Sequence, residues 1–340
     1  MKAIAGYAVD TTGSRSVTAR LSGAIFYMNA IFSLTLSWKF SINWPKLASH
    51  WAAAERLTGF IPDADYKIRK TIFSAVILCC FCGIVEHILS IISAVGLELK
   101  MADFLKTYIL SSHGFLMFKY EYSTYLGIFL FIMSKFATIL WNFQDLLVIL
   151  ICLGLSARYR RLNKQVQQLT EMDEQLTDIK NKKKVPCVSW RKAREGYVRQ
   201  AALVRRVDRE IGGIILLSNF NNMYFICLQL FLGISEGING SMINSSYYVL
   251  SLTWLVIRAA GVVLAAADVN LQSCGALSHI YVFPTSRYNV EVERLHKQLS
   301  KDFVALSGRG FYYLERNLLL KVAGVIATYE LVLIQYDSHH

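Results

Sequence analysis

The sequence has few residues that interrupt helices: its 340 residues include only 4 prolines and 20 glycines. They form no low-complexity linker, and no internal repeat is visible, so most of the chain can be helical. The metalloprotease motif H-E-x-x-H is absent, and the 7 histidines are scattered along the chain. These absences predict a helical protein that is not an enzyme and has no cofactor.

Cysteine gives no sign of a disulfide framework. The chain has 7 cysteines, an odd number, and none of them lies in a segment that is predicted below to be external. Most are therefore expected to act as small apolar side chains in the packing. No metal site is predicted.

The net charge is strongly positive, +12, with 36 Lys and Arg against 24 Asp and Glu. The basic residues occur in blocks beside apolar segments, which is the distribution that the positive-inside rule describes for membrane proteins. No patch of Lys and Arg interleaved with stacking aromatics follows the signature of a soluble nucleic-acid-binding fold. The charge is therefore interpreted as a sign of membrane topology, and no nucleic-acid partner is expected.

Apolar segments dominate the composition: 54% of the residues are hydrophobic and the mean hydropathy is +0.37. A helix needs about 20 apolar residues to cross a bilayer, and a segment in lipid satisfies its own backbone only as a helix. Six segments fit this description, at residues 21–37, 72–95, 123–157, 211–234, 247–275 and 319–336. The predicted fold class is an all-α integral membrane bundle with six visible transmembrane helices.

The connecting segments predict the orientation in the membrane. Three are rich in Lys and Arg and are expected in the cytoplasm: 38–71, 158–210 and 276–318. Two are poor in net positive charge and are expected outside: 96–122 and 235–246. Both N-x-S/T sequons, Asn239 and Asn244, fall in the second of these, where glycosylation is predicted. The C-terminal tail is then extracellular.

The third apolar segment is too long for lipid alone. Its apolar periodicity continues on one helical face through Leu162, Val166, Leu169, Met172, Leu176 and Ile179, and a charged break follows around Pro186. A further amphipathic helix, predicted to end at Gly308–Gly310, is marked by Leu295, Leu299, Phe303 and Leu306. Apolar faces must be buried, so these helices are expected to pack together, within or between subunits, as a cytoplasmic helical bundle.

Five parts make up the predicted organisation. Residues 1–157 hold the first three visible spans, and residues 158–210 form a cytoplasmic helical extension with a basic loop. Residues 211–275 hold the next two spans, and residues 276–310 form the cytoplasmic amphipathic helix. Residues 311–340 hold the last span and a short extracellular tail.

The last span carries a motif that resembles a known family. Thr328-Tyr329, followed after five residues by Gln335-Tyr336, is similar to the Thr-Tyr, five-residue, Gln-Phe signature that closes insect gustatory receptors. The fuller stretch from Leu306 onward resembles their sugar-receptor branch. The resemblance covers nearly the whole chain, including Trp44–Leu47, Glu86-His87, Trp141–Phe143, Gly154-Leu155 and Tyr224–Cys227.

The family has seven spans, so the six visible ones correspond to its second to seventh. The count places residues 1–20 outside although they lack the apolar core of a signal peptide. The chain is therefore expected to lack the family's first span, as a truncated isoform or gene model would.

The resemblance implies a receptor for an extracellular sugar. It would be a ligand-gated, non-selective cation channel in the plasma membrane of taste neurons, built as a homo- or heterotetramer with other gustatory receptors. The last span would line the pore, with the gate near Thr328, Tyr329, Gln335 and Tyr336, where a ring of amides offers oxygens to a cation. The residues alone leave another interpretation open, in which Gln335 only hydrogen-bonds at the membrane surface and Tyr336 belongs to the aromatic belt.

Polar side chains within the spans mark a candidate ligand site, because such groups usually face the bundle interior or a wet cavity. Glu86 shares a helical face with Ser90 and Ser93, and Arg258 reaches a similar depth, so the two charges can pair or bracket a hydroxylated ligand. The candidate sugar-binding residues are Asn29, Glu86, His87, Tyr125, Tyr224, Gln229, Trp254 and Arg258. An ordinary core role stays open for the aromatics, and Asp145 and Asp268 are interpreted as structural.

Three other kinds of membrane protein compete with this interpretation. A G-protein-coupled-type chemoreceptor would need the C-terminal tail inside the cell, against the charge pattern. A co-receptor subunit that does not conduct would share the sequence features of a conducting one. A secondary transporter is disfavoured, because the sequence shows neither paired half-repeats nor Gly/Pro-broken spans.

Overall fold

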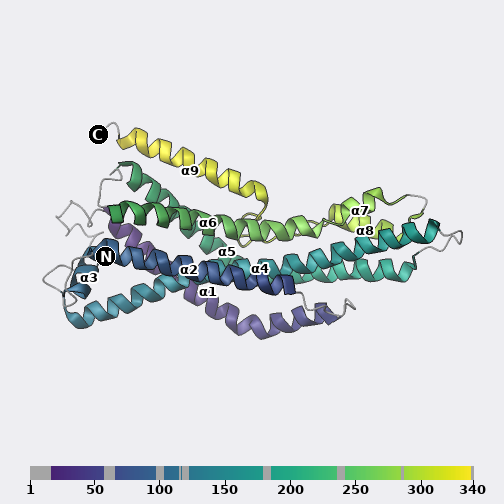
Figure 1. Cartoon of the computed structure of the whole chain (residues 1–340), viewed down its shortest axis with the longest axis horizontal. Coiled ribbons are helices and arrows are strands. Elements are labelled where there is room, and N and C mark those ends of the chain that lie inside the picture. Colours follow the sequence, from purple (N-terminus) through teal and green to yellow (C-terminus); the bar gives the residue numbers. More distant parts are fainter. Residues whose placement is uncertain are drawn as a thin grey trace.

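The structure is a computed structural model that describes residues 17–56, 66–96, 103–114, 116, 122–178, 185–235, 242–284 and 287–337. Within these ranges it consists of helices and connecting turns, with one isolated bridge between Ser307 and Tyr313. The long helices run side by side along the longest dimension of the molecule (Figure 1). The prediction of an all-α fold is confirmed.

Each predicted span coincides with one long helix. The described helices are α1 (Val17–Arg56), α2 (Tyr66–Val95), α3 (Phe104–Ser112), α4 (Thr124–Asp178), α5 (Cys187–Ser235), α6 (Met242–Ser273), α7 (Leu277–Val282), α8 (Val290–Lys301) and α9 (Arg316–Asp337). Among the described residues, the segments based on α1, α2, α4, α5 and α6 are long and apolar enough to cross a membrane. Helix α9 is shorter, with 22 residues, and carries Lys321 and Glu330 within its apolar sequence.

Helix α1 is longer than predicted. The apolar segment ends near residue 37, but the helix continues through Pro45 to Arg56. Phe40, Leu47 and Ala54, spaced seven residues apart on one face, are all buried. The prediction of a connecting segment that starts at residue 38 was therefore wrong, because burial of this face keeps a more polar stretch helical.

Helices α4 and α5 project beyond the other long helices, and the short helices α7 and α8 lie at that projecting end (Figure 1). The core there includes the large buried side chains of Tyr159, Trp190, Tyr197 and Leu295. Burying a large apolar side chain stabilises a fold by about 1.5–3 kcal/mol. The amphipathic stretches thus cover one another within a single chain, which is one of the two expected arrangements.

Helix α8 ends earlier than predicted, at Lys301 rather than near Gly308. The next residues run as extended chain, and side chains from other helices satisfy their backbone. Asn270 Nδ2 donates to the Val304 carbonyl at 3.0 Å, and Asp208 accepts from the Ser307 backbone N–H at 2.6 Å. These bonds replace the helical ones, so Leu306 is buried in an extended segment instead of on a helix face.

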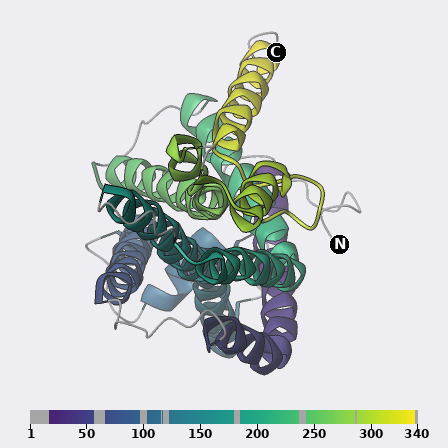
Figure 2. The same cartoon turned by 90° about the vertical axis from the view of Figure 1, so that its right-hand side faces the viewer.

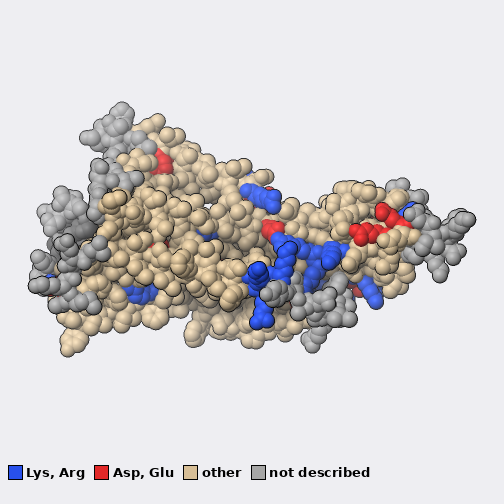
Figure 3. Space-filling view, viewed as in Figure 1, with Lys and Arg blue, Asp and Glu red and all other residues tan. Residues whose placement is uncertain are grey.

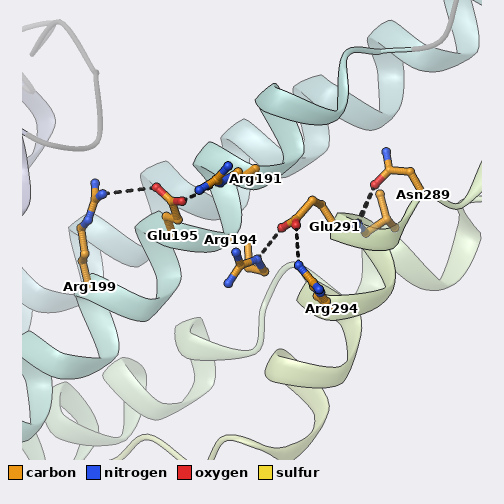
Figure 4. A network of polar contacts seen from close by, with 8 residues as sticks. Arg191, Arg194, Glu195, Arg199, Asn289, Glu291 and Arg294 are labelled. Carbon is orange, nitrogen blue, oxygen red and sulfur yellow. Dashed lines mark hydrogen bonds and ion pairs between the residues drawn. The ribbon is translucent and has the colours of Figure 1, made fainter.

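An ionic network fastens α8 to α5 (Figure 4). Glu291 accepts from Arg194 Nε at 2.6 Å and from Arg294 Nη1 at 2.9 Å. The Asn289 side chain caps α8 by accepting from the first free backbone N–H groups of the helix. Such a cap stabilises a helix by about 1 kcal/mol.

Helix α9 packs against α5 and α6 near its start and then diverges from the bundle (Figures 1 and 2). Leu320, Val325, Leu331 and Val332 along it are each more than half exposed. In one molecule, therefore, α9 leaves an apolar face uncovered. Lys and Arg gather where the largely uncharged part of the bundle meets the projecting helices (Figure 3).

Candidate functional site

A cavity of about 290 Å³ lies between the helices of the bundle and is lined by the six helices α1 to α6. It is lined by Ser22, Gly23, Phe26, Glu86, His87, Ser90, Tyr108, Ser112, His113, Ser134, Thr138, Trp141, Asn142, Phe225, Gln229, Tyr247, Ser251, Leu255 and Arg258. Hydroxyls, amides, one acid, one base and several aromatic rings therefore face one half-open cavity. This mixture is typical of sites that bind small polar ligands.

A chain of hydrogen bonds crosses the acidic side of the cavity from α5 through α6 to α2. Gln229 Nε2 donates to Ser251 Oγ at 3.3 Å, and Ser251 Oγ donates to Glu86 Oε1 at 2.8 Å. Ser251 is buried, so its hydroxyl holds the Glu86 carboxylate in place. A carboxylate has about four acceptor positions, so Glu86 can accept further hydroxyl donors.

Two polar atoms at the cavity wall have no hydrogen-bond partner among the described residues. They are Gln229 Oε1 and His87 Nε2, and both are buried. A buried polar atom without a partner costs about 1–3 kcal/mol. A ligand with hydroxyl groups in the cavity would satisfy them.

The basic residue of the cavity, Arg258, contacts two side chains of α4. Arg258 Nε lies 2.7 Å from Asp145 Oδ2, and Arg258 Nη1 donates to Asn142 Oδ1. The fully buried Asp145 also accepts from Ser218 and Asn222 on α5. The expectation that Arg258 could pair with Glu86 was wrong, because its ion-pair partner is Asp145.

Aromatic rings form another wall. The Arg258 guanidinium lies 4.8 Å from the ring centroid of Trp141, and the Trp141 ring lies 4.7 Å from that of Phe225. Tyr108 lies against His113 and Phe131, and the Tyr108 hydroxyl accepts from Lys135 Nζ at 2.9 Å. Faces of this kind contact the C–H surface of an amphipathic ligand.

Four of the eight predicted ligand residues lie together around the cavity. Glu86, His87, Gln229 and Arg258 line the cavity. Asn29 and Trp254 are buried elsewhere in the bundle, Tyr224 is half-buried, and Tyr125 is 88% exposed near the start of α4. These four do not line the cavity.

Several lining residues were not among the predicted ligand residues. Tyr108, Ser112 and His113 come from the segment predicted as an external connection, which contains the short helix α3. Ser134, Thr138 and Trp141 follow one another at spacings of four and three residues within an apolar stretch. That spacing puts them on one helical face, and it is the signal by which they could have been found.

The predicted gate residues lie on α9. The Thr328 hydroxyl donates to the Gly324 carbonyl of its own helix at 2.9 Å, and Tyr329 and Gln335 are exposed. The side chain of Tyr336 lies outside the described residues. Of the two sequons, Asn239 lies outside them as well, while Asn244 is at the start of α6 and accepts from Ser93 Oγ at 2.8 Å.

Cys79 and Cys82 have the C-x-x-C spacing of some metal and redox sites, but they lie within the apolar helix α2 as free cysteines. In the part of the chain that the structure describes, no three side chains of His, Cys, Asp or Glu could hold a metal ion together.

Comparison with known proteins places this chain among its relatives. The family described as "Trehalose receptor" matches residues 10–340. The chain is 33% identical over 315 residues to the gustatory receptor 5a for trehalose of Drosophila melanogaster, covering 90% of this chain and 67% of that protein. It is 31% identical over 319 residues to the gustatory receptor for sugar taste 64f of the same species, covering 92% of this chain and 65% of that protein. The chain thus spans about two thirds of the length of these relatives.

A solved structure supports the fold. The insect olfactory receptor OR5 from Machilis hrabei, in complex with eugenol, superposes with a TM-score of 0.65. The match covers 98% of this chain and 85% of that chain at 14% sequence identity. The two proteins therefore share the arrangement of their helices.

Proposed function

The chain belongs to the trehalose receptor family of insect gustatory receptors, and from that premise we propose that it binds a sugar in the cavity between Glu86 and Trp141. The family consists of receptors rather than enzymes, and with its long apolar helices the chain is a multi-pass membrane protein. The observation that carries the proposal is the chain of hydrogen bonds from Gln229 through Ser251 to Glu86, which lies in the same cavity as the aromatic rings of Trp141 and Phe225.

The cavity has the chemistry that a carbohydrate requires. A sugar presents hydroxyl groups around its rim and C–H groups on its faces, so it needs acceptors and donors together with an aromatic surface. Glu86, Gln229 and His87 supply the polar contacts, and Trp141 and Phe225 supply the rings. The volume of about 290 Å³ is near the lower end of the range for small-ligand pockets, about 300–1,000 Å³.

Sugar binding can influence α9 because the helices that line the cavity also support it. Helices α5 and α6 contribute Phe225, Gln229, Ser251 and Arg258 to the cavity, and α9 packs on the same two helices. We infer that a bound sugar draws these helices together and moves α9. The ligand shifts the equilibrium only through its higher affinity for the open arrangement.

The proposed channel is a tetramer in the plasma membrane, formed by this chain alone or with other gustatory receptors. Four copies of α9 would surround a central pore, and the exposed apolar face of α9 would meet its neighbours there. Gln335 would place a ring of amides near the outer mouth, where amide oxygens can contact a passing cation. The basic ends of the helices would lie in the cytosol and the C-terminus outside.

Current recordings from cells that express this chain, alone and with a full-length relative, test the proposal against a panel of sugars. Sugar-evoked cation current in either condition is the expected result. Sugar binding without current in both would identify a co-receptor subunit that does not conduct. No binding of any sugar by the purified chain would overturn the proposed ligand.

A further inference from the structure

A second cavity, of about 350 Å³, lies between α1 and α5, away from the sugar cavity. Asn43, Lys46, Leu47 and His50 line it from α1, and Arg206, Arg209 and Glu210 line it from α5. The cavity is therefore lined by three cations, Lys46, Arg206 and Arg209, and by one carboxylate, Glu210. The Glu210 carboxylate has its own partner on α1, because Glu210 Oε2 accepts a hydrogen bond from Asn43 Nδ2 at 2.8 Å.

The cations of this cavity differ from the other basic residues of the same helix. Helix α5 has six arginines, and four of them form ion pairs: Arg191, Arg194, Arg199 and Arg205. The remaining two, Arg206 and Arg209, line the cavity, and within the described ranges neither forms an ion pair. Lys46 opposite them has none either. The positive charges of Lys46, Arg206 and Arg209 are thus without an ion-pair partner among the described residues, and all three line this cavity.

The cavity lies at the edge of the exposed apolar surface of α1. Trp38, Ile42 and Trp44 are 68%, 66% and 43% exposed, and Lys46 follows immediately. Exposed tryptophan next to lysine is typical of the boundary between lipid and water. Basic side chains gather where the largely uncharged part of the bundle meets the projecting helices (Figure 3).

We propose that this cavity binds a phosphate-bearing anion, supplied either by the headgroup of an anionic phospholipid or by a soluble organic phosphate. Guanidinium groups match phosphate geometry with paired donors, and an ammonium group adds a point charge. The His50 ring is fixed because Nδ1–H donates to the Lys46 carbonyl at 2.6 Å. Basic pockets between transmembrane helices on the cytoplasmic side bind phosphorylated lipid headgroups in other proteins.

Binding at this place would join α1 to α5. Asn43 and Glu210 already connect the two helices, and an anion held by Lys46, Arg206 and Arg209 would add further bridges. The site shares no residue with the sugar cavity. Its test is therefore independent of the sugar proposal, and either one can fail alone.

The test uses the full chain in detergent micelles with a fluorescent phosphatidylinositol bisphosphate, followed by anisotropy. The variant is the double substitution Arg206→Gln and Arg209→Gln, and Lys46→Gln provides a second variant on the other wall. The matched control is Arg191→Gln with Arg199→Gln, which removes the same charge from α5 at residues that pair with Glu195 (Figure 4).

We expect the cavity double variant to bind about 30-fold more weakly, since each basic residue near an anionic surface contributes about a factor of five. The control should keep the affinity of the unmodified chain. Displacement of the probe by inositol trisphosphate would show that the phosphorylated headgroup suffices; failure to displace it would assign the ligand to a lipid. Equal losses in variant and control, or no binding to the unmodified chain, would overturn the proposal.

Discussion

Arg258 on α6 forms its ion pair with Asp145 on α4, Nε to Oδ2 at 2.7 Å, while the nearby Glu86 on α2 is held by Ser251. The two acids therefore have different roles. Asp145 balances a buried cation, which leaves Glu86 with acceptor capacity for a ligand.

Replacing one member of the buried pair should destabilise the protein strongly. Arg258→Gln leaves Asp145 buried without its cation, and breaking such a pair costs about 3–5 kcal/mol. The double variant Asp145→Asn with Arg258→Gln should recover much of this loss, because neither charge remains. Thermal unfolding of the purified chains measures both effects, and strictly additive losses would show that the pair is not coupled.

Glu86→Gln should weaken the sugar response while the protein still folds. The amide keeps the shape of the side chain but removes the charge, and a hydrogen bond to a charged group contributes about 1.5–3 kcal/mol. The sugar concentration for half-maximal current should rise by about tenfold or more. Tyr125→Phe, at an exposed position, is the control and should leave the dose-response curve unchanged.

The contact between α8 and α5 should weaken in acid. Hydrogen bonds from Arg194, together with the charges of Arg194 and Arg294, lower the pKa of Glu291 below its ordinary value of 4.5. The stabilisation is complete above pH about 4.5, and it is lost as the pH falls through the folded-state pKa. As the pH falls through this range, the melting temperature of Glu291→Gln should decline less than that of the unmodified chain. Glu293→Gln changes an exposed residue of α8, and its melting temperature should decline as much as that of the unmodified chain.

The orientation can be tested with epitope tags on intact cells. A tag after His340 should be accessible to antibody without permeabilisation, because the basic segments are expected to hold the opposite ends of the helices in the cytosol. A tag between residues 181 and 184 should become accessible only after permeabilisation. The reverse pattern would place the proposed pore mouth on the wrong side.

Charge at Gln335 should control conduction. Gln335→Lys would place four positive charges at the proposed constriction of a tetramer and should suppress cation current. Gln335→Asn keeps the amide and should conduct. Surface labelling should show equal amounts of both variants, and cation current unaffected by Gln335→Lys would place the constriction elsewhere.

The sequence allowed the spans to be predicted but not the details of their contacts. Apolar length placed all six long helices, and the periodicity through Leu162 and Val166 predicted the extension of α4, because both signals are local. The continuation of α1 past Pro45 depends on the burial of Leu47 against other helices. The partner of Arg258 depends on how α4 and α6 cross, which spacing along either helix does not encode.

The lining of the candidate ligand site was predicted only in part, for the same reason. Glu86 and Arg258 were recognisable because charges inside a span are costly and so indicate an interior position. The absence of Tyr125 from the cavity depends on the rotation of α4, which the pattern leaves open. The contribution of Tyr108 depends on a nine-residue helix in a segment that has the composition of a connection.

The turn before α9 is pressed against α5, where a Cβ atom on Gly212 would lie 3.2 Å from the backbone nitrogen of Arg309. Helix α9 has 22 residues, so it extends about 33 Å from this support at 1.5 Å per residue. A tilt of about 5° at the support would displace the far tip by about 3 Å over that length. A small rotation of α5 at this contact would therefore produce a larger displacement at the C-terminal end of α9.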